Sequence, residues 1–497
     1  MNILKRCKTG VPGLDEILGG GFIAQRMYLI DGNPGAGKTT FAMQFLSQGV
    51  RDGETCLYVT LSETAQELRS AAESHNWSLE GIEIVELIVD PGELEGDGHL
   101  TMLHASEVEL TETTQKLIAA INRCNPSRLV LDSLSEMRLL AQSSLRYRRQ
   151  VLALKQLFLG RSCTVIMLDD RTAEGPDLQL HSIAHAVISL EAKSPPYGRL
   201  RRQLEVRKFR ASDFSSGLHD FSIERAGLIV YPRLVASNYV LEFKQSPVLS
   251  NVKLLDDLMG GGLDRGTSTL LIGPPGCGKS TIAVQYAAAA VSRGDHAAIF
   301  MFDETRAALM MRSKGIGMHF QEGDGPGEMR LRQIDPAEVS PGEFTALVRA
   351  AVQKGGARVV VIDSLNGYLN SMPHDDYLNA QLHELLSYLN NSGVATFLIV
   401  AQSGLMGSAM TAPVEASYLA DTVVVLRYFE HLGSVKKAIS ALKKRTGSHE
   451  EAIREIWFDE KGIHLSEPLM GLRGILTGVP VELASQNGRS AKPDSAG

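Results

Sequence analysis

Two short segments have the composition and spacing of a phosphate-binding loop. Residues 32–39 are GNPGAGKT and residues 273–280 are GPPGCGKS, and both fit the pattern G-x-x-x-x-G-K-[ST]. The glycines let consecutive backbone N–H groups converge on phosphate oxygens, while the lysine reaches the β- and γ-phosphates and the last hydroxyl binds Mg²⁺. A glycine turn could match once by chance, but two matches favour a pair of ATP sites. The residues expected to bind the two nucleotides are Gly32, Asn33, Pro34, Gly35, Ala36, Gly37, Lys38, Thr39 and Thr40, and Gly273, Pro274, Pro275, Gly276, Cys277, Gly278, Lys279, Ser280 and Thr281.

An aspartate stands at the end of an apolar run in each half of the chain. Asp132 follows RLVL and Asp363 follows VVVI, and Ser-Leu comes next in both places. A carboxylate at such a strand end is placed to hold the Mg²⁺ shell beside the phosphate loop. An aspartate that only caps a turn would show the same pattern. The predicted metal ligands are Thr39 with Asp132 and Ser280 with Asp363, and the predicted cofactors are ATP and Mg²⁺.

A glutamate that could activate water follows the next predicted strand in each half. Glu63 lies in LSET and Glu304 in FDET. Hydrolysis needs a carboxylate to orient or deprotonate the attacking water, which makes Glu63 and Glu304, the latter with Asp303 beside it, the predicted catalytic bases. The alternative for each glutamate is a position in the first turn of a helix, where the helix dipole favours negative charge.

These residues recur because the chain is an internal duplication. Residues 10–75 align with residues 251–316 at a constant offset of 241 positions, which matches the two GGG segments and the two loop lysines. We expect an N-terminal domain at 1–240, a C-terminal domain at 241–480 and a disordered polar tail at 481–497, with residues 236–251 as the linker. Each half alternates short apolar runs with helix-length segments. This order predicts two tandem α/β P-loop domains, each a mostly parallel sheet covered by helices on both faces.

Composition agrees with a globular chain of two domains. Hydrophobic residues make up 44% and charged residues 22% of 497 positions. The net charge of −7 gives no global attraction to nucleic acid or to an anionic membrane, so neither is an expected partner. No apolar run reaches the ~18 residues of a membrane span, and the five cysteines show no disulfide or zinc spacing. We therefore expect a cytoplasmic protein with reduced thiols.

The sequence resembles the KaiC family of RecA-like ATPases over residues 9–480. The resemblance rests on the duplicated phosphate loops, the GGG segments, LSET and FDET, and the late segments RKFRAS (207–212) and KKRTGSHEEAIREI (443–456). In this family the late segments supply a lysine and an arginine to the γ-phosphate held by a neighbouring subunit. The resemblance implies that Lys208 and Arg210 serve one ring, and Lys443 and Arg445 the other. It also implies a double-ringed homo-hexamer with nucleotide sites between subunits.

The chain departs from the family at one carboxylate. The family commonly has two adjacent glutamates after the strand, whereas this chain has Ser62-Glu63 and Asp303-Glu304. The first carboxylate is absent in the N-terminal half and one methylene shorter in the C-terminal half. General-base assistance is worth ~10² to 10⁴ in rate, so this departure predicts slow turnover, which suits a timer or switch better than a motor. The basic late segments would also fit a solvated or nucleic-acid-facing strand, but their repetition in both halves favours a phosphate-related role.

The resemblance also bears on self-phosphorylation. The family's circadian-clock member phosphorylates a Ser-Thr pair near its second active site, and the matching positions here are Ser417 and Tyr418. The resemblance implies that Ser417 is a phosphate acceptor in the C-terminal half, with Tyr418 as the rival acceptor. A serine that merely starts a strand is the alternative.

The leading hypothesis from the sequence is an ATPase with serine autophosphorylation in its C-terminal domain. It would act as a nucleotide-dependent switch or timer toward regulatory protein partners that the sequence does not identify. A recombinase-like DNA-binding ATPase and a nucleotide-sensing scaffold with weak catalysis are the alternatives.

Overall fold

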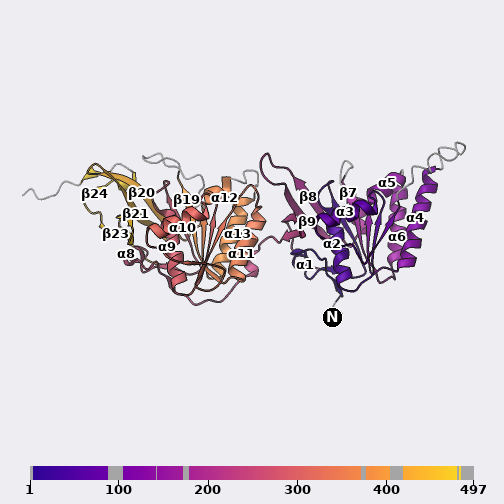
Figure 1. Cartoon of the computed structure of the whole chain (residues 1–497), viewed down its shortest axis with the longest axis horizontal. Helices are drawn as coiled ribbons and strands as arrows, with labels where there is room; N and C mark the ends of the chain where they lie inside the picture. The colour runs from indigo at the N-terminus through magenta and orange to yellow at the C-terminus, as the bar shows by residue number, and fades with distance from the viewer. Residues whose placement is uncertain are drawn as a thin grey trace, which may run out of the picture. The chain divides into compact units, whose positions relative to one another are not determined.

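The computed structural model describes residues 4–87, 105–141, 143–171, 178–370, 377–402, 418–477 and 481–482. The chain divides into two compact units, Met1–Arg233 and Leu234–Gly497 (Figure 1). Among the predicted site residues, Ser417 lies outside the described ranges. No helix in the described part of the chain is long and apolar enough to cross a membrane.

The first unit alternates strands and helices and then ends in antiparallel strands. Its elements are β1 (Arg6–Cys7), α1 (Leu14–Ile17), β2 (Phe22–Ile23), β3 (Met27–Gly32), α2 (Lys38–Arg51), β4 (Cys56–Thr60), α3 (Ala65–Ser74), β5 (Ile82–Glu86), α4 (Ala105–Cys124), β6 (Arg128–Asp132), α5 (Leu134–Ala141), α6 (Ser144–Phe158), β7 (Thr164–Asp170), α7 (Leu178–Ile183), β8 (Ala186–Lys193), β9 (Arg201–Phe209), β10 (Leu218–Glu224) and β11 (Gly227–Tyr231).

The second unit repeats this order with small additions. Its elements are η2 (Ala236–Asn238), β12 (Pro247–Val248), α8 (Lys253–Leu258), β13 (Leu263–Asp264), β14 (Ser268–Gly273), α9 (Lys279–Ser292), β15 (His296–Met301), α10 (Arg306–Gly315), β16 (Gln321–Glu322), β17 (Glu328–Gln333), α11 (Pro341–Gln353), β18 (Ala357–Asp363), α12 (Leu365–Asn370), α13 (Leu378–Asn391), β19 (Ala395–Ala401), β20 (Thr422–His431), β21 (Ser434–Lys444), β22 (Arg454–Asp459), β23 (Gly462–Pro468), β24 (Leu472–Arg473), η4 (Ile475–Thr477) and β25 (Val481–Glu482).

One large mixed sheet organises each unit. The described strands of the first unit lie in the order β11-β10-β9-β8-β3-β7-β6-β4-β5, and those of the second in the order β16-β17-β15-β18-β19-β14-β20-β21-β22-β23. Strands from β8 to β5 and from β16 to β20 pair in parallel, and the remaining strands pair antiparallel. The α/β fold class predicted from the sequence is confirmed.

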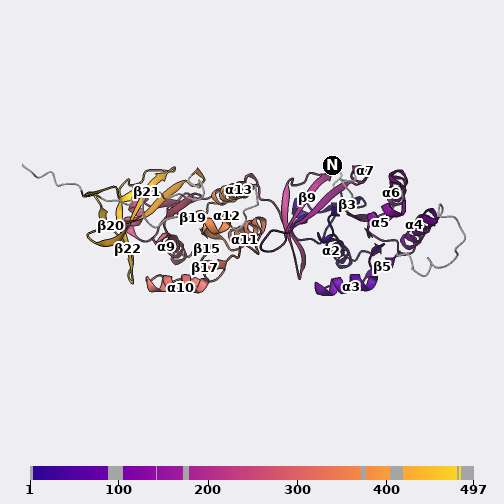
Figure 2. The ribbon, with the colours of Figure 1, turned by 90° about the horizontal axis from the view of Figure 1, so that it is seen from above.

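Both faces of each sheet are covered by helices. In β3, Tyr28 and Ile30 join one core with α2 and α3, whereas Met27 and Leu29 join a second core with α4, α5 and α6 (Figure 1). The second unit has the same two cores, with α9 and α10 on one face and α11, α12 and α13 on the other. Seen from above, α3 lies beside β5 and α10 beside β17, at the same edge of each sheet (Figure 2). Burial on both faces explains why the central strands are almost continuously apolar.

The segment that we predicted to be a linker, residues 236–251, packs on the second unit along its first part. Ala236 is buried, and its N–H donates to Glu384 Oε2 at 2.9 Å. The ring of Tyr239 meets the ring of Tyr388 edge-on at a centroid distance of 5.3 Å. These contacts attach the segment to α13, so it belongs to the second unit.

The first two residues of the predicted tail are paired. Val481–Glu482 forms an antiparallel ladder with Leu472–Arg473, whereas residues 483–497 lie outside the described part of the chain.

Candidate nucleotide sites

Each phosphate loop joins a central strand to the helix that follows it. The loop of the first unit runs from the end of β3 to α2, which begins at Lys38, and that of the second runs from β14 to α9, which begins at Lys279. Neither helix has a side-chain cap, because Gly37 and Gly278 occupy the N-cap positions. The first N–H groups of both helices therefore remain available to an anion at the positive end of the helix dipole.

The glycines before the lysines are required by conformation and by space. Gly37 has φ 108° and Gly278 has φ 109°, in the left-handed region that favours glycine. A Cβ atom on Gly37 would lie 2.6 Å from Ile223 Cδ1, and one on Gly278 would lie 2.2 Å from the Phe458 ring. Close packing against β10 and β22 thus fixes each loop in a shape whose cradle fits a phosphate group.

The two loop lysines are buried and turned back on their own loops. Lys38 Nζ donates to the carbonyls of Gly32 and Asn33, each at 3.0 Å. Lys279 Nζ donates to the carbonyls of Gly273 and Pro274 at 2.8 and 2.7 Å. Both ammonium groups therefore stand over the loop where the phosphates of a nucleotide would lie.

Only the first lysine has a carboxylate partner among the described residues. Asp170, at the end of β7, approaches Lys38 Nζ to 2.6 Å. In the second unit burial lowers the pKa of Lys279, and the nearby charges of Cys277 and Asp363 oppose that effect. Asp170 was not among the residues predicted from the sequence, although Asp169 and Asp170 follow the apolar run VIML much as Asp132 follows RLVL.

The predicted metal ligands lie together in each unit. Thr39 Oγ1 donates to Asp132 Oδ2 at 3.5 Å, and the hydroxyl of Ser280 hydrogen-bonds the carboxylate of Asp363. Burial raises the pKa of both aspartates, and in the first unit a hydrogen bond from Tyr58, at 2.5 Å, opposes this shift.

This donor set fits Mg²⁺ better than a metal held by protein alone. The described residues contain no group of three or more His, Cys, Asp or Glu that could hold a metal ion. One hydroxyl and one carboxylate leave most positions of an octahedral ion to phosphate oxygens and water, as is usual for Mg²⁺ beside a nucleotide.

The two predicted bases have different surroundings. Burial raises the pKa of Glu63, and the charges of Asp132, Glu67 and Asp170 raise it further. Burial also raises the pKa of Glu304, but Arg312 opposes the shift through an ion pair of 2.7 Å. A raised pKa makes a carboxylate a stronger base, so Glu63 is the better suited of the two to accept a proton.

Arg312 is a second residue that the sequence reasoning missed. It comes from α10 and also donates to Thr281 Oγ1 at 3.2 Å, which places it beside the phosphate loop. The duplication puts Ala71 at the matching position of the first unit, 241 residues earlier. The neighbour of Glu304, Asp303, accepts a hydrogen bond from Ser364, which follows Asp363.

The structure does not bring the four basic residues of the late segments to the phosphate loops of their own units. Lys208 donates to the carbonyl of Ala184 at 2.7 Å, and Arg210 donates to that of Ser182 at 2.9 Å. In the second unit Lys443 donates to Ala420 O at 2.8 Å and Arg445 to Tyr418 O at 3.1 Å.

The strand register shows where these residues lie. Phe209 is opposite Ala186 at the start of β8, whereas the phosphate loop begins at Gly32, opposite Leu190. The same holds in the second unit, where Lys444 is opposite Thr422 at the start of β20. Each basic pair is therefore at the end of the sheet away from its own loop. Tyr418, the rival acceptor, is 56% exposed.

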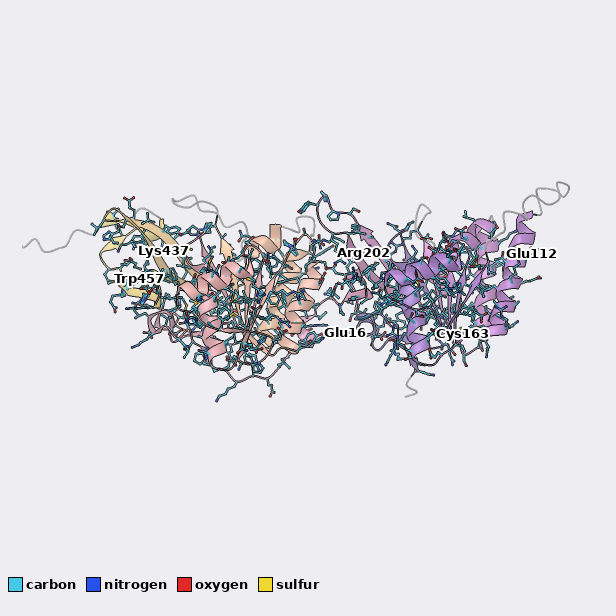
Figure 3. The ribbon with its side chains drawn as sticks, in the orientation of Figure 1. Glu16, Glu112, Cys163, Arg202, Lys437 and Trp457 are labelled. Carbon is cyan, nitrogen blue, oxygen red and sulfur yellow. The ribbon has the colours of Figure 1, made fainter. Side chains whose placement is uncertain are left out.

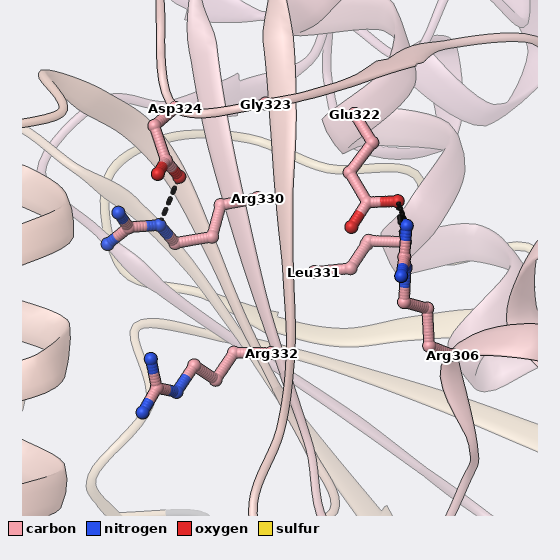
Figure 4. Close-up of a pocket in the computed structure, with 7 residues that line it drawn as sticks. All are labelled: Arg306, Glu322, Gly323, Asp324, Arg330, Leu331 and Arg332. Atoms are coloured by element: carbon pink, nitrogen blue, oxygen red, sulfur yellow. Dashed lines mark hydrogen bonds and ion pairs between the residues drawn. The ribbon is translucent and has the colours of Figure 1, made fainter.

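A surface pocket of about 430 Å³ lies elsewhere on the second unit (Figure 4). Two ion pairs, Arg306 with Glu322 at 2.5 Å and Arg330 with Asp324, already use charges in its wall. None of its lining residues belongs to a phosphate loop, so it is not the nucleotide site. The lining residues are Arg306, Glu322, Gly323, Asp324, Arg330, Leu331 and Arg332.

Comparison with known proteins identifies relatives along the whole chain. The family model described as KaiC ATPase matches residues 7–235 and 248–469. The circadian clock protein KaiC3 of Synechocystis sp. is 26% identical over 489 residues, which cover 97% of this chain and 95% of the relative. The circadian clock oscillator protein KaiC of Thermostichus vulcanus is 25% identical over 493 residues, with coverage of 97% and 93%. That of Synechococcus elongatus is 24% identical over 494 residues, with coverage of 97% and 92%.

Each loop lysine should serve only its own nucleotide. Replacement of Lys38 or of Lys279 by Ala is expected to remove about half of the nucleotide bound by the chain, because each ammonium contacts one phosphate loop. Nucleotide extracted from the purified protein and counted per chain measures this effect. Lys354→Ala, on the exposed surface of the second unit, is the control and should leave the count unchanged. Full stoichiometry in either loop variant would exclude that loop as a site.

Proposed function

The chain belongs to the KaiC family of ATPases, and we propose that it hydrolyses Mg·ATP in both units and signals its nucleotide state to protein partners. One observation carries the proposal. In each unit a buried lysine over a glycine loop, a hydroxyl–aspartate pair and a glutamate of raised pKa lie at the same carboxyl edge of the sheet. Ligands of open parallel sheets bind at this edge.

The residues of the chain would share the work of hydrolysis. The loop N–H groups and the lysine would bind the phosphates, and the lysine charge would stabilise the charge of the transferring group. Mg²⁺, held by Thr39 and Asp132 in one unit and by Ser280 and Asp363 in the other, supplies further neutralisation of phosphate charge when bound. Glu63 and Glu304 would orient the attacking water and take its proton.

The two sites should work at different rates. Glu63 is not tied to an arginine among the described residues, whereas Arg312 holds Glu304 in an ion pair. An ion pair stabilises the ionised carboxylate and weakens it as a base, which favours faster hydrolysis in the first unit than in the second. Slow hydrolysis suits a switch or timer, the role that the names of the relatives suggest.

A ring of six subunits would complete the sites. Lys208, Arg210, Lys443 and Arg445 lie at the sheet end away from their own phosphate loops, so they can reach a γ-phosphate only if it is held by another subunit. Head-to-tail contacts of this kind close into rings when the rotation between subunits is suitable. A basic residue supplied across an interface is worth ~10³ to 10⁵ in the rate of phosphoryl transfer.

The basic strands give little support to the alternative function of a DNA-binding ATPase. Arg207 pairs with Glu205 at 3.2 Å, and Lys436 pairs with Glu455 at 2.9 Å. Lys437, labelled in Figure 3, lies 5.0 Å from the ring centre of Phe458. With carboxylates and a ring beside these cations, β9 and β21 do not form a uniform cationic face of the kind that follows a phosphate backbone.

We include serine autophosphorylation in the proposal for the second unit. Arg445 binds the carbonyl of Tyr418 and lies 3.5 Å from Asp421, so a residue proposed to reach γ-phosphate is attached to the segment that follows Ser417. Because Arg445 lies at the sheet end away from its own phosphate loop, the ATP for this transfer would be held by the adjacent subunit, and Glu304 of that subunit, with Asp303 beside it, is the proposed acceptor of the serine proton.

Hydrolysis in the first unit should depend on Glu63. In a chain whose second site is silenced by Lys279→Ala, Glu63→Gln is expected to lower phosphate release by ~10²- to 10⁴-fold, because the amide cannot accept a proton. Released phosphate under saturating Mg·ATP measures the rate. Glu73→Gln, an exposed change on α3, serves as the matched control. An equal rate for the Glu63→Gln and Glu73→Gln chains would remove Glu63 from the mechanism.

Two parts of the proposal can be tested together: the ring, and the action of basic residues from one subunit at the nucleotide site of another. Light scattering with Mg·ATP should give six times the mass of the chain, and a monomer at micromolar concentration would contradict the ring. Separately prepared Glu63→Gln and Lys208→Ala subunits, each with Lys279→Ala, should hydrolyse more ATP after mixing than the mean of the two alone. A mixed ring contains interfaces in which an intact Glu63 meets an intact Lys208. No gain on mixing would show that Lys208 acts within its own subunit or not at all.

Incubation with Mg·ATP should place phosphate on Ser417. Ser417→Ala is expected to abolish most of the incorporated phosphate while hydrolysis in the first unit continues, and Tyr418→Phe should change little. Mass spectrometry of the peptide that spans residues 411–422 measures the outcome. Phosphate found only on Tyr418, or on neither residue, would refute the kinase part of the proposal.

A further inference from the structure

The two phosphate loops differ in what surrounds the lysine. In the first unit the Lys38 ammonium and the Asp170 carboxylate form an ion pair of 2.6 Å, with 8% and 28% of the two side chains exposed. In the second unit the hydrogen-bond partners of Lys279 among the described residues are loop carbonyls and the Cys277 sulfur, at 3.8 Å, and the nearby Asp363 forms no ion pair with it. The first ammonium is therefore neutralised by a partner that the second lacks.

The strand register shows that this difference is a substitution at one position of the duplicated fold. Gly32 at the end of β3 is opposite Asp170 on β7, and Gly273 at the end of β14 is opposite Ala401 on β19. Asp170 and Ala401 are thus equivalent. At another pair of equivalent positions the acidic residue is in the second unit: the first unit has Ser62 where the second has Asp303. The acid that contacts the segment after the metal-binding aspartate is Asp170, at the end of β7, in the first unit and Asp303, which follows β15, in the second.

Hydrogen bonds connect each of these acids to the turn after the metal-binding aspartate. In the first unit Ser133 and Ser135 share a hydrogen bond, and Ser135 Oγ donates to Asp170 Oδ2 at 3.4 Å. In the second unit Ser364 Oγ donates to Asp303 instead.

The residue that matches Ser135 has another role in the second unit. Asn366 binds the backbone of Ala401 through hydrogen bonds of 2.9 and 2.8 Å. Since Asp170 contacts both Lys38 and Ser135, it stands between the phosphate loop and the turn.

An anion at this place must interact with an incoming triphosphate. The loop lysine reaches the β- and γ-phosphates, so its ammonium must leave Asp170, or share its charge with that carboxylate, when ATP binds. Breaking a partly buried ion pair costs free energy, and the remaining carboxylate repels the γ-phosphate. ADP carries no γ-phosphate and meets less of this repulsion.

We propose that Asp170 is an internal competitor of the γ-phosphate for Lys38, and that it gives the first site a lower affinity for ATP, relative to ADP, than the loop alone would have. The inference rests on the proposed function of this loop as a nucleotide site. Asp170 also supplies a counter-ion for a buried ammonium when no phosphate is present. At the equivalent position the second unit has Ala401, and none of its described residues forms an ion pair with Lys279.

The test uses the full chain with Lys279→Ala, so that only the first site binds. Calorimetric titration with Mg·ATPγS and with Mg·ADP gives the two affinities. Asp170→Asn should tighten Mg·ATPγS about tenfold and Mg·ADP by no more than about threefold, because most of the competition is with the γ-phosphate. Asp170→Glu, which keeps the charge, should stay close to the parent chain. In the absence of nucleotide, Asp170→Asn should lower the melting temperature, since Lys38 then remains buried without a counter-ion.

A reciprocal variant tests the same idea in the other unit. In a chain with Lys38→Ala, Ala401→Asp should weaken Mg·ATPγS binding at the second site about tenfold. If the Lys279→Ala chain binds both nucleotides and Asp170→Asn changes the two affinities equally or not at all, the competitor role is overturned while the nucleotide site stands. If the Lys279→Ala chain binds neither nucleotide, the first loop is not a nucleotide site and both proposals fall.

Discussion

A buried ammonium at the carboxyl edge of a parallel sheet is the constraint on which both units depend. Removing a lysine from water is costly unless its charge is met, and each unit meets it with the carbonyls of the glycine loop. The loop turns back toward those carbonyls through glycines in left-handed conformations, of which Gly37 and Gly278 pack closely against β10 and β22. Two helical layers then bury the sheet, and its buried central strand, β3 or β14, ends where the loop begins.

Duplication preserved this frame and let the carboxylates around it change. Both units keep the lysine, the hydroxyl–aspartate pair and a glutamate of raised pKa. Around that set, Asp170 pairs with the loop lysine in one unit and Arg312 pairs with the glutamate in the other. A carboxylate beside the lysine affects phosphate binding, whereas an arginine beside the glutamate affects proton transfer. The two sites can therefore diverge in function without any change of fold.

The antiparallel strands give each unit a group of basic residues at the edge of the sheet away from its phosphate loop. β9 and β21 begin at the edge of the sheet that carries the phosphate loop and end, with their basic residues, at the opposite edge. Within one unit such an arrangement separates the cations from the nucleotide. In an assembly with head-to-tail contacts it would allow the nucleotide of one subunit to respond to its neighbour, because the interface is then part of the site.

The sequence alone determined the α/β class and located the phosphate-loop motifs and the residues of the hydroxyl–aspartate pairs, because each depends on residues close together in the chain or on the period of apolar runs. It could also align the two halves, since an offset of 241 positions is visible by eye. The partners of Lys38 and Glu304 were decided by tertiary structure. Asp170 reaches Lys38 through the register of β3 with β7, and Arg312 reaches back from α10 to Glu304 in the segment before that helix. Contacts of this kind depend on strand register and helix packing, and neither leaves a motif in the sequence.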